Sequence, residues 1–200
     1  MYIYCSNIGK LKVLHIINSL ATGGAEKLVL DTVPLLVERG YTVDVLLLNG
    51  IKSPFYEELS SLNCCTIYVL GASYYNPFYV FKMRKYLSGY NIVHVHLFPA
   101  QYFTVFAKLL FARKSKLVFT EHSTQNTRLN NAVFKFLERF IYSQYQKIIC
   151  ITSNVKDVLI NKLQIPKHKL LVIENGIKFH AIGNAKAYDR NLLGYGNADQ

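Results

Sequence analysis

The sequence predicts an α/β fold built on a doubly wound parallel sheet, and three observations support this prediction. Apolar runs of strand length alternate with segments of helical period along most of the chain. Runs such as VDVLLL and IVHVHLF are apolar at consecutive positions, as in strands that helices cover on both faces. Strand–helix alternation repeated this often is typical of parallel strands joined by crossover helices.

Each strand is placed on a short apolar run, and each helix on a segment with apolar residues at helical spacing. The first helix carries Leu28, Val29 and Leu36 on one face, and Gly40 ends it. The predicted strands are Lys12–Asn18, Thr42–Leu48, Cys65–Leu70, Ile92–Leu97, Lys116–Thr120, Lys147–Ile151 and Leu170–Ile173. The predicted helices are Ala25–Arg39, Pro54–Leu62, Pro77–Leu87, Ala100–Ala112, Asn130–Gln144 and Asn154–Leu163.

One domain of this kind accounts for most of the chain, because 200 residues suffice for one α/β unit with a sizeable core. We expect this domain to span residues 1–180, while residues 181–200 lose the pattern and form a linker or tail. The four cysteines form no CxxC pair, which favours reduced thiols and a cytoplasmic protein. The most apolar long stretch, residues 92–112, is interrupted by polar side chains and does not read as a transmembrane helix.

The chain is strongly basic, with 23 Lys and Arg against 12 Asp and Glu and a net charge of +11. No acidic residue occurs between Glu58 and Glu121. Seven basic residues lie in that span: Lys82, Arg84, Lys85, Lys108, Arg113, Lys114 and Lys116. A basic region with interleaved aromatic residues favours either an anionic membrane surface or nucleic acid as a partner.

Polar and small residues follow the predicted strands at the edge where an open parallel sheet binds its ligands. Outside these positions the strands are apolar, so the convergence favours a functional site. We expect six of these residues to contact substrate: Gly23, Gly24, Glu26, His96, Glu121 and Ser153.

The glycine pair in NSLATGGAEK precedes the first predicted helix, where unpaired N–H groups and the positive end of the helix dipole can hold a phosphate. Glycine lets an anion reach the backbone. A tight turn without a ligand is the alternative interpretation. Glu26 in the first helical turn stabilises the helix dipole or contacts an acceptor.

Histidines gather at the same edge. His94 and His96 are two apart on a strand and share a face. We interpret His94 as a core residue and His96 as lying nearer the ligand crevice expected at this edge of the sheet. We interpret His122 as lying at the mouth of that crevice. With His122 as a third ligand the pair also suits zinc, but no cysteine or carboxylate stands at ligand spacing beside it.

Two other classes of ligand fit less well. The loop SLATGGAE is not the GxGxxG of dehydrogenases, and the second strand ends at Asn49 where an acidic residue should hold the ribose of NAD. A nucleic-acid-binding protein would account for the charge, but no recognised motif of that class is present.

Five motifs occur in order along the chain: GGAEK, NIVHVH, FTEHS, ICITSNVKDVL and VIENGI. Together they resemble the N-terminal domain of glycosyltransferase family 4, over roughly residues 12–178. The resemblance implies a Rossmann-like domain, the N-terminal half of a GT-B architecture, and a retaining enzyme that needs no metal or other cofactor. Its substrates would be a nucleotide-sugar donor, UDP-linked in our interpretation, and an acceptor held mainly by this domain.

The same resemblance implies roles for individual residues. Gly23 and Gly24 would approach the donor pyrophosphate, and His122 would be the catalytic histidine that faces the transferred sugar. Asn175 and Gly176 would close the domain before the crossover, and we expect them to contact substrate as well. The aspartate that the family usually has before the histidine pair is Asn91 here, and the one after NGI is Lys178, which puts an interdomain contact in doubt.

The resemblance also implies a C-terminal donor domain, whose cations stabilise the leaving group. This chain ends where that domain would begin, so we expect the chain alone to be inactive. We expect six cations among aromatic residues to face an anionic membrane: Lys82, Arg84, Lys85, Lys108, Arg113 and Lys114.

Together these features predict a peripheral enzyme on the cytosolic face of the inner membrane. Its acceptor would be a pyrophosphate-linked lipid of bacterial O-antigen or capsule assembly. Packing of the aromatics on the sheet is the alternative account of the basic region. A non-catalytic sugar- or lipid-binding module and, less favoured, a nucleic-acid-binding protein are the alternative functions.

Overall fold

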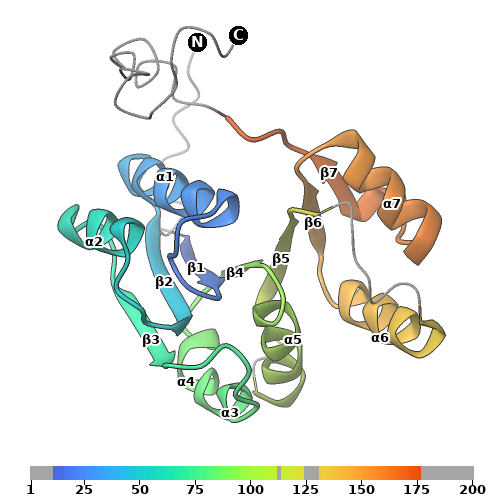
Figure 1. The fold of residues 1–200 in the computed structure, drawn as a ribbon, viewed down its shortest axis with the longest axis horizontal. Coiled ribbons are helices and arrows are strands. Elements are labelled where there is room, and N and C mark those ends of the chain that lie inside the picture. The colour runs from blue at the N-terminus through green and yellow to red at the C-terminus, as the bar shows by residue number, and fades with distance from the viewer. Residues whose placement is uncertain (1–10, 112–113, 124–130, 177–200) are drawn as a thin grey trace, which may run out of the picture.

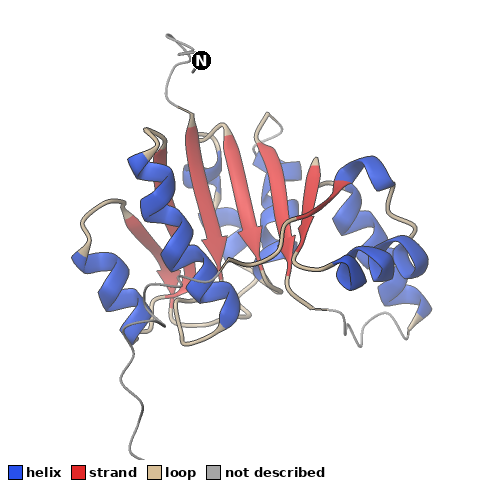
Figure 2. Ribbon diagram, turned by 90° about the horizontal axis from the view of Figure 1, so that it is seen from above, coloured by secondary structure: helices blue, strands red, loops and turns tan. Residues whose placement is uncertain are grey.

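The computed structural model describes residues 11–111, 114–123 and 131–176. Its centre is a sheet of seven strands in the order β3-β2-β1-β4-β5-β6-β7, and every neighbouring pair is parallel. Figure 2 shows the strands running in one direction with helices on both sides. The strands are β1 (Lys12–Ile17), β2 (Thr42–Asn49), β3 (Ile67–Gly71), β4 (Ile92–His96), β5 (Lys116–Glu121), β6 (Lys147–Cys150) and β7 (Leu170–Val172). The predicted doubly wound α/β fold is confirmed.

The helices form two layers. They are α1 (Gly24–Glu38), α2 (Pro54–Ser61), α3 (Tyr79–Lys82), α4 (Arg84–Leu87), α5 (Ala100–Phe111), α6 (Ala132–Ser143) and α7 (Ser153–Leu163), and a 3-10 turn, η2 (Lys167–Lys169), precedes β7. Helices α1 and α2 cover one face of the sheet, while α3, α4, α5 and α6 lie along the other (Figure 1). One apolar cluster fills each layer, because alternate residues of a strand point to opposite faces.

The predicted elements differ from the observed ones mainly at their ends. The third strand begins at Ile67 rather than Cys65, and the segment predicted as one helix over Pro77–Leu87 forms two single turns, α3 and α4, that meet at Met83. The domain boundary near residue 180 and the tail over 181–200 lie outside the described residues, and so do residues 1–10.

Three helix starts follow ordinary capping chemistry. Ser53, Asn131 and Thr152 each accept a hydrogen bond from a backbone N–H in the first turn of α2, α6 and α7. Helix α1 differs, because its N-cap is Gly23 and no side chain caps it. Within the described residues, no helix combines the length and the apolar character needed to cross a bilayer.

Candidate functional site

The site lies where the strand order reverses, at the carboxyl ends of β1 and β4. In an open parallel sheet this is the position at which a ligand crevice forms. Asn18, directly after β1, ties the two loops together there. Its Nδ2 donates to the carbonyl of Phe98 at 2.7 Å, and its Oδ1 accepts from the N–H of Ala100 at 3.3 Å. Leu97, which directly precedes Phe98, has φ 63°, a left-handed conformation that is uncommon for leucine and is often found at functional sites.

The glycine loop brings the uncapped start of α1 to this edge. Gly23 has φ −165° and ψ 167°, an extended conformation open to any residue, so backbone geometry does not require glycine there. A Cβ on Gly24 would meet no atom within 4 Å. The protein's own packing therefore leaves free space beside Gly24, next to the first N–H groups of a helix, where an anion is stabilised.

Glu26 lies over this loop. A Cβ on Gly23 would collide with the carboxylate of Glu26, which shows that the side chain folds back across the helix start. Partial burial raises the pKa of Glu26, and a hydrogen bond from its own backbone N–H opposes that shift. In this structure the carboxylate therefore takes an anion's place at the N-terminus of α1.

Four histidines, His15, His94, His96 and His122, lie together at this edge of the sheet. Register pairs His15 of β1 with His94 of β4, so both rings lie on the α1 face of the sheet. His15 Nδ1 lies 3.1 Å from His96 Nε2, and His96 Nδ1 lies 3.4 Å from His122 Nε2. His94 Nε2 instead meets the hydroxyl of Thr120 at 2.7 Å. These contacts connect three rings, His15, His96 and His122, into one hydrogen-bonded chain.

Burial keeps these rings neutral at pH 7. It lowers the pKa of His15 and of His122 from 6.5 to about 4. Burial first, and then the neighbouring histidines, hold the pKa of His94 and of His96 well below 6.5. A neutral imidazole donates through one nitrogen and accepts through the other, so His122 acts as a hydrogen-bonding group rather than as a cation.

The structure corrects the place predicted for His96. Its side chain is 1% exposed and lies between His15 and His122, so it stands behind His122 and does not line the crevice. The reason is that residue 96 still belongs to the β4 ladder and points to the same helix-covered face of the sheet as His15 and His94. His94, predicted to be a core residue, is half-buried, and its Nε2 lies against Thr120.

The histidines also satisfy the distance condition for a metal site. Ligand atoms of His15, His94 and His96 all lie within 4.8 Å of one another. This trio differs from the one considered from sequence, since His15 replaces His122. No cysteine or carboxylate of the described residues joins the group.

The other predicted substrate residues have different surroundings. Glu121 ends β5, and its carboxylate accepts from the N–H of Ser123 at 3.0 Å and from the hydroxyl of Tyr142. Ser153 is exposed as the first residue of α7, and Asn175 and Gly176 are exposed beyond β7. Thus Gly24 and His122 lie at the same edge of the sheet, after β1 and β5, while Glu121 supports the local structure.

A family model described as Glycosyltransferase Family 4 matches residues 22–180, well over half of the chain. The chain belongs to glycosyltransferase family 4. The family predicted from the five motifs is therefore confirmed. Among curated protein sequences, none matches this chain.

Solved structures agree with the fold of this family 4 chain. A glycosyltransferase from Rickettsia africae superposes with a TM-score of 0.70 at 21% identity, over 92% of this chain and 48% of its own. Anabaena Alr3699/HepE in complex with UDP and glucose gives 0.66 at 16% identity, over 85% and 46%. The lipopolysaccharide outer core galactosyltransferase WaaB gives 0.60 at 11% identity, over 84% and 46%. The chain spans about half the length of these GT-B proteins, as one Rossmann-like domain does.

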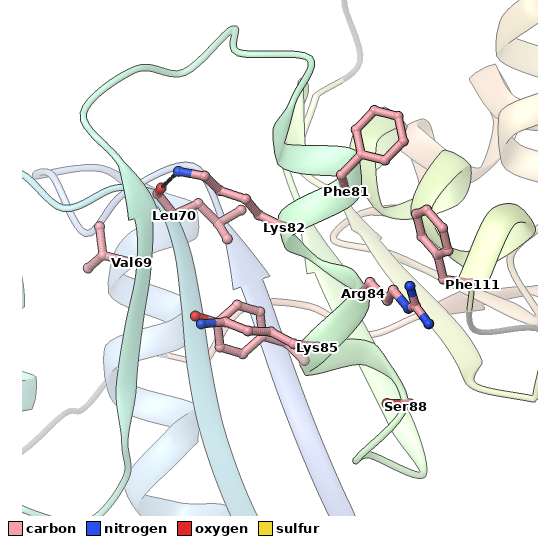
Figure 3. A pocket seen from close by; sticks show the side chains of 9 residues that line it. Val69, Leu70, Phe81, Lys82, Arg84, Lys85, Ser88 and Phe111 are labelled. Atoms are coloured by element: carbon pink, nitrogen blue, oxygen red, sulfur yellow. Dashed lines mark hydrogen bonds between the residues drawn. The ribbon is translucent and has the colours of Figure 1, made fainter.

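The family 4 domain also carries a basic surface beside β3, one of the two edge strands of the described sheet. A pocket of about 670 Å³ lies there, and Figure 3 shows Lys82, Arg84 and Lys85 around it with Phe81 and Phe111. Lys82 Nζ donates to the carbonyl of Leu70 at 2.9 Å. Arg84 lies over the ring of Phe111 at 5.6 Å and Lys85 over that of Tyr86 at 4.7 Å, contacts that hold the cations in place.

One predicted surface cation is buried instead. Lys108 is 9% exposed, because it lies on the face of α5 that also buries Ala100 and Thr104. Burial, and then the charge of Lys169, lowers the pKa of Lys108. Lys108 is therefore not a membrane-facing residue. Lys82, Arg84, Lys85 and Lys114 are exposed, and Arg113 lies outside the described residues.

Two features of the domain were not predicted from sequence. His15 joins the histidine chain, and the signal for it was a single polar residue within the apolar run VLHII. Helix α6 exposes apolar side chains, chiefly Val133 and Phe136, beside the exposed Lys135 and Arg139. Its amphipathic pattern was visible, but which face would be covered depends on tertiary packing.

Proposed function

We propose that this family 4 chain is the acceptor-side domain of a retaining glycosyltransferase. The enzyme transfers a sugar from a nucleotide-sugar, UDP-linked in our interpretation, to a lipid-linked saccharide of surface-polysaccharide assembly. The observation that carries the proposal is the free space beside Gly24 at the uncapped start of α1, at the same sheet edge as His122. Uncapped N–H groups suit a phosphate oxygen, and a neutral imidazole suits a sugar hydroxyl.

The nucleotide part of the proposal draws support from the structural neighbours. Alr3699/HepE was solved with UDP and glucose and with UDP-glucose. Those proteins are about twice as long as this chain, so transfer is proposed for a protein that carries a second domain. A cationic second domain would stabilise the leaving diphosphate.

The acceptor part of the proposal rests on the basic surface. Lys82, Arg84 and Lys85 form a cationic rim beside Phe78 and Phe81, which are 68% and 61% exposed. Exposed aromatic rings and cations together suit the headgroup region of an anionic leaflet. We propose that this face binds the cytosolic leaflet of the inner membrane, where a lipid-linked acceptor would be presented.

Binding to the chain itself tests the proposal. The ligands are UDP, UDP-N-acetylhexosamines and a short pyrophosphate-lipid analogue, and the variants are Gly24→Val and His122→Ala. The matched control is Gly89→Val, since a Cβ there also fits but the residue lies at the opposite end of the strands. We expect both site variants to lose the lipid analogue by tenfold or more, and the control to keep it. Equal binding by all four proteins, or steeply salt-dependent binding of any DNA duplex, would contradict the proposal.

A further inference from the structure

We propose that His15 and His96 are positioning residues that hold His122 in one tautomer, with its proton on Nδ1 and its Nε2 accepting. The inference rests on the proposed function of His122 as a group that meets the sugar. The inference gives the hydrogen bonds among the three rings a direction. It also assigns two further residues, His15 and His96, to the site. The geometry that carries it is the pair of ring-to-ring contacts at 3.1 and 3.4 Å.

The chain can run in only two directions, because each neutral ring has one N–H. If His15 Nδ1–H donates to His96 Nε2, then His96 must carry its proton on Nδ1 and donate it to His122 Nε2. If the direction is reversed, His122 Nε2–H donates to His96, and His96 Nε2–H donates to His15 Nδ1. In that second arrangement the proton of His15 has to sit on Nε2.

The surroundings of His15 decide between the two directions. Its Nε2 is buried and, within the part of the chain that the structure describes, has no hydrogen-bond partner. The reversed direction would place a buried N–H at that atom with no acceptor, which is the rarer and more costly kind of unpaired group. The first direction, from His15 to His122, leaves only an unpaired acceptor lone pair at His15 Nε2. The hydrogen bonds therefore run from His15 through His96 to His122.

The consequence lies at His122. Because its Nε2 accepts from His96, its Nδ1 must carry the proton, and this N–H is the one available to a ligand. A neutral N–H donor suits the oxygen of a sugar hydroxyl. The two buried rings thus fix the chemical character of a residue at the crevice without touching the substrate themselves.

The same cluster admits a metal ion by distance alone. Its rings, however, already face polar partners: His94 Nε2 meets Thr120, and both nitrogens of His96 meet histidine nitrogens. A metal would have to replace these contacts in a site without cysteine or carboxylate. Hydrogen bonding accounts for more of the ring nitrogens than a metal site would. The test therefore includes a measurement of the metal content of the purified protein.

The experiment reads the tautomer directly from the ¹⁵N shifts of histidine rings in the chain at pH 7.5, without any substrate. We expect His122 Nε2 to resonate as an unprotonated nitrogen and Nδ1 as a protonated one. His15→Phe removes the first donor, so we expect the His122 resonances to move toward the average of two tautomers. His15→Asn, whose amide can still donate from the position of Nδ1, should restore them. His94→Phe is the matched control, because His94 is a ring of the same cluster outside the hydrogen-bonded chain, and its replacement should leave His122 unchanged.

Three results of the ¹⁵N experiment would overturn the inference. They are a protonated Nε2 on His122 in the unaltered chain, no change in His15→Phe, or an equal change in His94→Phe. Stoichiometric transition metal in the purified protein would also overturn it, in favour of a metal centre. The readout needs no sugar, so it separates this inference from the proposed function. If only the proposed function is wrong, His122 shows the expected tautomer but the chain does not bind the ligands.

Discussion

The hydroxyl of Tyr142 donates a hydrogen bond to the carboxylate of Glu121, and the two residues join α6 to the end of β5. Tyr142 is buried, and its pKa is raised well above 10, first by burial and then by the Glu121 charge. We expect Tyr142→Phe to destabilise the domain by about 1–3 kcal/mol, because a carboxylate oxygen loses a donor in a half-buried setting. Urea unfolding measures this, with the exposed Tyr75→Phe as control. A loss below about 0.5 kcal/mol would show that the bond contributes little.

Stability should fall with acid because of the buried histidines. The pKa of His15 is about 4 in the folded protein and 6.5 as a free side chain, so between these values the unfolded chain binds a proton that the folded chain does not. The contribution is complete above pH 6.5 and is lost as pH falls toward 4. It amounts to at most about 3 kcal/mol for this residue.

Unfolding of the unaltered chain and of His15→Phe at pH 7.5, 6 and 5 isolates this contribution. The free energy of unfolding should fall less steeply with acid in the variant, which has no imidazole to protonate. The carboxyl groups are common to both proteins and cancel in the difference. Parallel pH profiles would mean that His15 is not held neutral by burial.

The two glycines after β1 and β2 should respond differently to a side chain. A Cβ on Gly24 meets open space, so we expect Gly24→Ala to change stability by no more than about 0.5 kcal/mol. A Cβ on Gly50 would lie 2.5 Å from the side chain of Val69, so Gly50→Ala should destabilise by about 1–3 kcal/mol. Thermal unfolding of both variants is the measurement. A large loss in Gly24→Ala would mean that the space beside it is needed for folding rather than for a ligand.

The basic surface beside β3 should bind anionic vesicles through Lys82 and Lys85. Replacing Lys82 and Lys85 with Gln should weaken binding to phosphatidylglycerol vesicles about 30-fold at low salt, at about 1 kcal/mol per cation. The matched control replaces Lys162 and Lys167, two exposed lysines of α7 and the turn after it. Sedimentation with the vesicles measures both. If the two double variants bind equally, net charge rather than this surface drives the interaction.

Some features followed from sequence because they depend on neighbours along the chain. The period of two places His94 and His96 on one face, and apolar runs such as that of β2 mark strands buried on both sides. Strand–helix alternation led to the doubly wound sheet, and the ordered motifs led to the family. The sheet edge that gathers Gly24 and His122 followed from the rule for parallel sheets.

Other features depended on contacts between distant segments, which no local pattern contains. His15 and His96 are 81 residues apart, and their contact required β1 and β4 to be neighbours in a particular register. The same packing buried His96 behind His122 and turned Lys108 toward the interior. By itself the sequence determined the fold class, the family and the edge of the sheet that carries the site. Only the tertiary structure decided which side chains reach that edge and which support it from behind, because burial and register arise between segments far apart in the chain.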